Sequence, residues 1–287
     1  MKFPKRLVSG SFMAQGAGPL PEFSNPPVSE VALSVEFAAI DGWRPAHAGL
    51  YWARIKSEYP FTEAQPPLPS QIEKFGERLP QVPAVIFDMA DPNALRSWFL
   101  SDDRTRLIQV QRDRFVVNWR KVTGTEVYPR YEREMRPRFE QEWQRFEEFL
   151  RDESLGSLSA RQCEITYVND IPRGEGWNTP AESLSLFSPW WGEVSIGFLK
   201  TPESVNVAGS FRMPGETGRL HFATQNVIRN RDQLEAVQLR LTARGSPDSQ
   251  DLDGVLAWMD LGREWIVRGF ADITSPRAHA LWGGSSK

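Results

Sequence analysis

Arginine, amide and histidine side chains alternate with apolar residues along several predicted strands. Successive side chains of a strand point to opposite faces, so this alternation gathers the polar ones on one face of a sheet. Because guanidinium and amide groups recognise anions and hydrogen-bonding groups, the sequence predicts a face that binds a protein partner or a small anionic ligand; the alternative is an ordinary solvated sheet face. The predicted binding residues are Arg212, Arg219, His221, Gln225, Gln238 and Arg240, with Asn118 and Arg120 from the first half of the chain. The same alternation adds Ser195, Asn206, Ser210, Thr242 and Arg244 to this face.

His221 is the weak catalytic candidate of this set, since Arg212 or Arg240 could stand beside it and let it act as a base. A lone strand histidine is more often a bystander, so no catalytic residue is predicted. The alternative is a hydrolase or nuclease that uses His221 with arginine and aspartate residues from nearby loops.

The sequence predicts neither a metal site nor a cofactor. It has three widely separated histidines and a single cysteine, Cys163, which excludes an intramolecular disulfide. The carboxylate clusters fall at loop positions, where aspartate is favoured for turns and helix caps. These clusters are Asp102-Asp103 and Asp248, Asp251 and Asp253. No phosphate-binding loop, dinucleotide fingerprint, nucleophile elbow or H-E-x-x-H motif occurs.

The composition is that of a globular protein, with 40% hydrophobic and 25% charged residues among 287. A formal net charge of -3 does not favour a nucleic-acid coat or a membrane-surface binder. The arginines of 96–138 are interleaved with acidic residues, so the local positive field is small. Nucleic-acid binding is therefore only a minor alternative. No apolar run has the length of a membrane span or an export signal, so we expect a cytoplasmic protein.

The pattern of elements is repeated in the two halves of the chain. After a flexible leader over 1–27, the units 28–158 and 159–287 each give a strand, a helix, a run of about four strands and a long helix. In the first unit we expect strands at 28–37, 85–89, 96–100, 105–111 and 114–121, helices at 48–59 and 138–151, and a Pro-rich loop over 60–83. In the second we expect strands at 162–168, 193–200, 204–214, 219–229 and 236–244, a short helix from 180 and a long one over 252–270.

This order predicts an α+β fold built from two β-α-β4-α units that form one continuous domain. Joining the two sheets edge to edge would remove two exposed edges and give one long curved antiparallel sheet with helices on one face. The arrangement is that of the TATA-binding-protein-like or helix-grip class, an analogy of element order that carries no function.

Several segments together resemble a sporadically distributed bacterial family of conserved hypothetical proteins of unknown function. The segments are 25–31, 105–110, 114–119, Tyr128-Pro129 with Tyr131, the helix with Phe139, Trp143 and Phe146, 164–172, 270–274, and His279 with Trp282-Gly283. The resemblance brings no catalytic residues. A patchy distribution favours genes that move between genomes, such as those of defence or toxin–antitoxin systems. With few histidines and no acid–base cluster, we expect a non-catalytic binding or regulatory protein.

Overall fold

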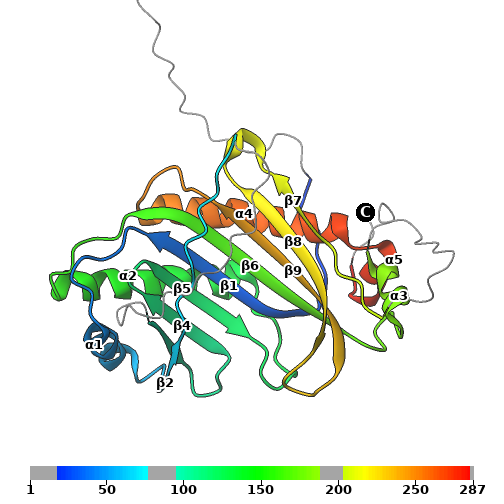
Figure 1. Cartoon of the computed structure of the whole chain (residues 1–287), viewed down its shortest axis with the longest axis horizontal. Helices are drawn as coiled ribbons and strands as arrows, with labels where there is room; N and C mark the ends of the chain where they lie inside the picture. Colours follow the sequence, from blue (N-terminus) through cyan, green and yellow to red (C-terminus); the bar gives the residue numbers. More distant parts are fainter. Residues whose placement is uncertain (1–17, 77–94, 188–202, 285–287) are drawn as a thin grey trace, which may run out of the picture.

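The chain forms one large antiparallel sheet with helices packed against it (Figure 1). The computed structural model describes residues 18–76, 95–187 and 203–284, which contain nine strands in the order β2-β3-β4-β5-β1-β6-β9-β8-β7. The strands are β1 (Val28–Phe37), β2 (Phe61–Gln65), β3 (Arg96–Leu100), β4 (Arg106–Gln111), β5 (Arg114–Arg120), β6 (Ala160–Pro172), β7 (Ala208–Arg212), β8 (Arg219–Ile228) and β9 (Glu235–Gly245). The α-helices are α1 (Pro45–Ile55), α2 (Arg136–Asp152), α3 (Pro180–Ser183), α4 (Leu252–Ile273) and α5 (Pro276–Leu281). Shorter helical turns are the π-helical η1 (Tyr131–Met135) and the 3-10 turns η2 (Leu184–Leu186) and η4 (Pro214–Glu216).

Strands β1 and β6 form the centre of the sheet. They pair antiparallel from Val28 opposite Asn169 to Phe37 opposite Ala160. Strands β5, β4, β3 and β2 extend the sheet from β1, and β9, β8 and β7 extend it from β6. The described sheet is therefore continuous across the middle of the chain.

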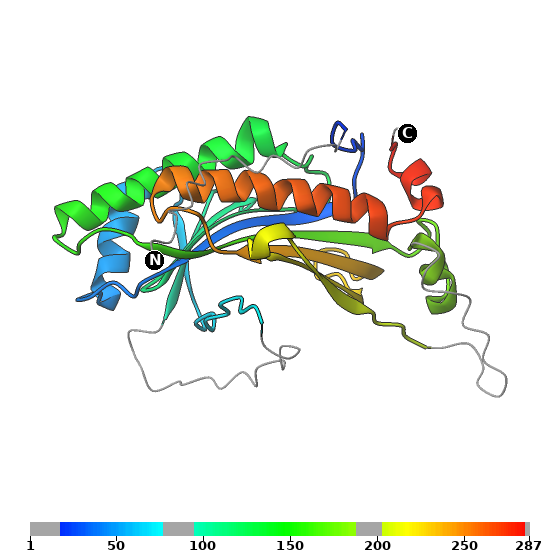
Figure 2. The same ribbon diagram turned by 90° about the horizontal axis from the view of Figure 1, so that it is seen from above.

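Helices α2 and α4 cover one face of the sheet (Figure 2). The i, i+4, i+7, i+11 spacing of apolar residues predicts one buried stripe on α2, and its four members are at most 1% exposed: Phe139, Trp143, Phe146 and Leu150. Phe146 stacks on Phe115 of β5, with ring centroids 5.0 Å apart. On α4, Asp251 caps the N-terminus by accepting a hydrogen bond of 3.0 Å from the backbone of Gly254. Asp251 thus has the capping role that the sequence predicts for aspartate at such a position.

Some expected elements differ in the structure. Phe61–Gln65, predicted as loop, is the edge strand β2. Its side chains are mostly exposed and show no apolar alternation, so only its backbone pairing with β3 identifies it as a strand. Phe23, inside the predicted leader, packs edge-on against Phe270 with centroids 5.2 Å apart. α3 is a single turn beyond the end of the sheet, next to the unpredicted α5 (Figure 1). The predicted strands 85–89 and 193–200 and positions 1–17 lie outside the described residues.

The described residues hold no helix with both the length and the apolar character that crossing a membrane requires.

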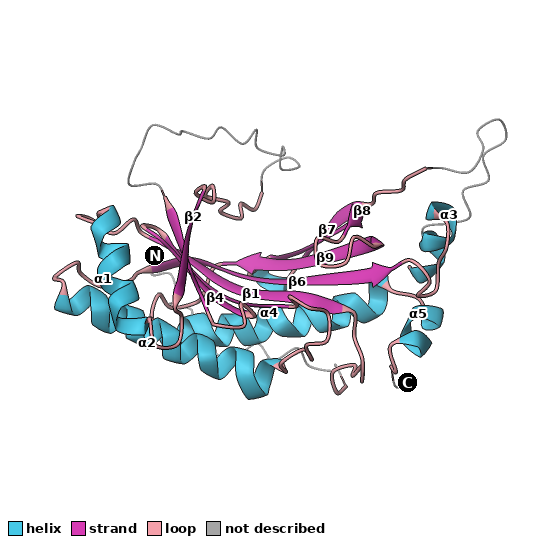
Figure 3. Ribbon diagram, turned by 90° about the horizontal axis from the view of Figure 1, so that it is seen from below, coloured by secondary structure: helices cyan, strands magenta, loops and turns pink. Residues whose placement is uncertain are grey.

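A segment without regular secondary structure crosses the other face of the sheet, opposite α2 and α4 (Figures 2 and 3). This segment, residues 66–76, is called the strap below. It belongs to the predicted Pro-rich loop, but it lies on the polar face instead of leaving that face open to solvent.

Candidate functional site

The register of the strands places the predicted binding residues of the second half on the strap-bearing face. Cross-strand neighbours are Arg219 and Arg244, His221 and Thr242, and Gln225 and Gln238. Arg240 is opposite Ala223, and Arg212 of β7 is opposite Arg219. The alternation of polar and apolar residues thus correctly assigns these side chains to one face of the sheet. Some of them contact the strap and others do not.

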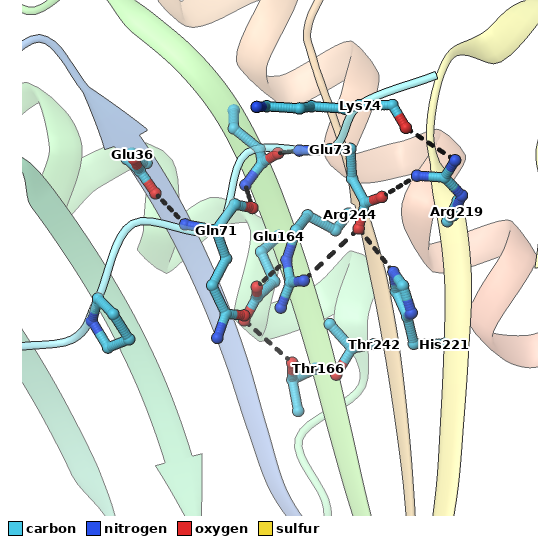
Figure 4. A network of polar contacts seen from close by, with 12 residues as sticks. Glu36, Gln71, Glu73, Lys74, Glu164, Thr166, Arg219, His221, Thr242 and Arg244 are labelled. Atoms are coloured by element: carbon cyan, nitrogen blue, oxygen red, sulfur yellow. Dashed lines mark hydrogen bonds and ion pairs between the residues drawn. The ribbon is translucent and has the colours of Figure 1, made fainter. Parts of the chain in front are cut away.

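One carboxylate of the strap collects three basic side chains, as Figure 4 shows. Arg219 donates from Nη1 to Glu73, and His221 Nε2 lies 2.6 Å from Glu73 Oε1. Arg244 Nη1 lies 3.5 Å from the same Oε1, and its Nε donates to Glu164 of β6 at 2.6 Å. We call Glu73, Arg219, His221 and Arg244 the Glu73 cluster.

The Glu73 carboxylate is charged and largely shielded from solvent, its side chain being 6% exposed. Burial alone would raise the pKa of Glu73, but the hydrogen bonds from His221 and Arg219 outweigh it and lower the pKa below its ordinary value. Because an ionised carboxylate only accepts hydrogen bonds, His221 Nε2 carries the proton in this contact.

Arg219 also contacts the two strap residues that follow. Its Nη2 donates to the Lys74 carbonyl at 2.8 Å, and its guanidinium lies over the Phe75 ring, 4.5 Å from the centroid. Arg212 approaches the same ring at 5.8 Å. Two arginines thus provide a cation–π site beside the carboxylate site.

Glutamine side chains of the sheet hold the strap backbone. Gln111 accepts from the Leu68 amide at 2.8 Å and donates to the Leu68 carbonyl at 3.1 Å. Gln162 accepts from the Glu73 amide at 2.6 Å and donates to the Gln71 carbonyl at 2.5 Å. Both glutamines therefore bind main-chain groups of an extended segment.

A buried ion pair supports the middle of the strap. Arg114 Nη2 lies 2.6 Å from Glu36 Oε2, with side-chain exposures of 6% and 7%. Arg114 also donates to the Pro69 carbonyl at 3.1 Å, while Glu36 accepts from the Ser70 hydroxyl. Both charges thus have further partners in the strap, as buried ions require.

The two first-half residues predicted to bind are part of the sheet's own polar network. Asn118, 2% exposed, accepts from Gln109 at 2.7 Å and donates to Glu30 at 2.7 Å. Arg120 donates to the Arg104 carbonyl at 3.1 Å. Neither has a described hydrogen bond or ion pair with the Glu73 cluster, so the structure does not bring them into it.

The other predicted residues lie further along the same face or at its edge. Gln225 donates to Gln238 at 3.0 Å, and Gln238 donates to Asp170 at 3.0 Å. Arg212 is half exposed and pairs with Glu216 at 3.0 Å. Arg240 is exposed and has no hydrogen bond or ion pair with another described residue. Its charge acts on Glu30 of β1 without a hydrogen bond: burial raises the pKa of Glu30, and the charge of Arg240 offsets part of that rise.

Sequence reasoning missed Glu73, Gln162 and Glu164. Glu73 lies in a loop whose path no local pattern sets, while Gln162 and Glu164 look like ordinary polar positions of a strand. The Pro-rich loop predicted over 60–83 contains Glu73 and is the one signal that points to it. Nowhere in the described part of the chain do three His, Cys, Asp or Glu side chains gather as metal ligands would.

No protein-family model matches this chain, and no curated protein matches its sequence.

Proposed function

We propose that this chain is a non-catalytic cytoplasmic binding protein whose polar sheet face holds a protein partner through the partner's acidic groups. The observation that carries the proposal is the convergence of Arg219, His221 and Arg244 on one carboxylate. Charge-assisted bonds of this kind are stronger and more directional than neutral ones. The exposed Arg240 on the same face offers a further contact for an anion.

We also propose that the two halves are copies of one β-α-β4-α unit, as in the helix-grip arrangement. Three features support this: β1 and β6 are neighbours at the centre, the later strands of each half extend outward from them, and a long helix on the same face follows the last strand of each half.

Charge reversal at Arg240 tests the proposed function. Three tagged proteins would be purified from the native host: the wild type, the Arg240→Glu variant and the matched control Arg133→Glu. Mass spectrometry would identify the proteins and small molecules that co-elute with each. Arg133 is an exposed arginine of η1, the turn that leads into α2, and has no described hydrogen bond or ion pair. We expect a protein that co-elutes with the wild type and the control to be lost with Arg240→Glu. Identical eluates from all three would refute the proposal.

An enzyme is the second candidate, because a carboxylate that orients an imidazole is also the arrangement of a general base. His221 and Glu73 have this geometry at 2.6 Å, but no described hydroxyl or thiol bonds to His221. A His221→Gln variant that still binds the partner but lacks a hydrolase or nuclease activity that the purified wild type shows would favour the enzyme.

Nucleic-acid binding is the weaker alternative. The arginines of the face are interleaved with Glu36, Glu164 and Asp170, which reduces the local positive field. A gel shift with mixed DNA and RNA that weakens steeply with added salt would support it.

A further inference from the structure

The strap is bound to the sheet in the way a separate extended peptide would be. Its main-chain groups pair with side chains of the sheet rather than with a strand ladder. Five buried residues that hold it come from β4, β5, β1, β6 and β8: Gln111, Arg114, Glu36, Gln162 and Arg219. Arg96 of β3 donates to the Pro66 carbonyl at 3.2 Å. Main-chain contacts of this kind are independent of sequence, so another extended segment can make them.

Side-chain contacts add selectivity at one end of the strap. The Glu73 carboxylate enters the basic cluster, and the ring of Phe75, two residues on, packs against the guanidinium of Arg219. Lys74, between them, is exposed. The strap residues whose side chains contact the basic side chains of this face are thus a glutamate and, after one exposed residue, an aromatic residue.

The hydrophobic core does not depend on the strap. None of residues 66–76 belongs to the core cluster, and Ile72, its bulky aliphatic side chain near Glu73, is 41% exposed. Segments that bury little apolar surface are the first to open locally. The strap can therefore leave the face without opening the core.

An empty face would have unmet bonding groups. The five residues named above are each at most 8% exposed beneath the strap. Without Glu73, the cations Arg219 and Arg244 would have only Glu164 as a described acidic partner. A replacement for the strap must therefore bring both a carboxylate and extended backbone.

We infer that the strap is an internal stand-in for an acidic segment of the partner, and that this segment displaces it. The partner segment is extended and has the glutamate-x-aromatic pattern that Glu73 and Phe75 show in the strap. This inference rests on the proposed function and deepens it. Because a tethered strap competes at an effective concentration of about millimolar, the wild-type chain binds such a segment weakly unless other contacts, such as one with Arg240, assist.

A labelled peptide of residues 66–76 tests the inference. Its binding would be measured by fluorescence anisotropy with the wild-type chain and with a full-length variant in which a Gly/Ser linker of equal length replaces the strap. We expect binding to be at least about tenfold tighter with the strap-replaced variant, because the internal competitor is gone. The same peptide with Glu73→Gln should bind that variant about tenfold more weakly or worse, because it lacks the charge-assisted bonds.

A second variant keeps the test valid if the linker variant does not fold. Full-length Glu73→Gln retains the strap with weaker docking and should bind the unmodified peptide more tightly than the wild type does. The inference would be overturned if the wild-type, strap-replaced and Glu73→Gln chains all bound the labelled peptide equally well. It would also be overturned if inorganic phosphate or mixed RNA displaced the labelled peptide as well as the unlabelled peptide does.

The outcomes separate this inference from the proposed function. Suppose that a host protein requires Arg240 for binding but binds the wild-type and strap-replaced chains equally well. The proposed function would then be supported, and the strap would not be a stand-in for the partner. If no partner depends on Arg240 but the strap-replaced variant binds the peptide tightly, the proposed function is refuted and the peptide site is supported.

Discussion

Glu73 is held by two guanidinium groups and an imidazole, which makes docking of the strap depend on pH. Its pKa in the folded chain is below the ordinary 4.5, so the ionised form stabilises the docked strap. That stabilisation is fully present above about pH 4.5 and is lost as pH falls through the lowered pKa. We predict that hydrogen-exchange protection of the strap amides, corrected for the intrinsic rate, falls below about pH 4.5 while that of β6 persists.

The Glu73→Gln variant is the control for this pH effect. It should show weak strap protection at every pH and no step near pH 4.5. Loss of protection in the strap and β6 together would instead indicate global acid unfolding and would contradict a local cause.

The buried pair of Glu36 and Arg114 supports a second residue-scale prediction. Arg114→Ala leaves the Glu36 carboxylate buried without its cation, which should lower the free energy of unfolding by about 3 kcal/mol or more. Urea unfolding would measure the change. The control is Arg173→Ala, because Arg173 pairs with Glu235 at 2.8 Å while both side chains are more than half exposed; its cost should stay below about 1 kcal/mol. Equal costs for the two variants would show that burial does not matter here.

At the scale of elements, the patterns that local chemistry sets are readable from the sequence. The stripe Phe139, Trp143, Phe146 and Leu150 identifies the buried side of α2, and alternation assigns the faces of β8 and β9. The edge strand β2 was missed because its side chains are mostly exposed and carry no such alternation. The Glu73 cluster was missed for a different reason: a loop with no periodicity brings its carboxylate to strands that lie about 150 residues further along the chain. Neither Glu73 nor β8 alone carries a signal of that contact.

The contact between α4 and the sheet gives the prediction at this scale. A Cβ at Gly269 would lie 2.3 Å from Leu220 Cδ2, a buried side chain of β8. Gly269→Ala gains about 1 kcal/mol of helix propensity but overpacks the core, and we expect a net loss of about 1–2 kcal/mol in the free energy of unfolding. Urea unfolding of Gly269→Ala, alone and with Leu220→Ala, would measure it.

Gly49 of α1 is the matched control, because a Cβ there would meet no atom within 4 Å. Gly49→Ala should be stabilising by about 0.5–1 kcal/mol. If Leu220→Ala does not reduce the cost of Gly269→Ala, the close packing of α4 on β8 is not its cause.

At the scale of the whole molecule, the central pairing of β1 with β6 makes the two halves depend on each other. Val31, Leu33 and Val35 of β1 and Ile165 of β6 are fully buried. A separated first half would expose the whole edge of β1, and such an edge readily pairs with another chain. We therefore predict that 1–158 and 159–287, expressed separately, aggregate or self-associate.

Co-expression of the two halves should restore a one-to-one complex, measured by size-exclusion chromatography with light scattering. Ile165→Pro removes a backbone donor from the middle of β6 and clashes with the ladder, so it should abolish the complex. Ser157→Pro, in the exposed connection before β6, should leave the complex intact. Two halves that each remain folded and monomeric would show that the sheet is not a single cooperative unit. The strap, which binds β4 and β5 of the first half and β6 and β8 of the second, would then be a contact between two separately stable halves.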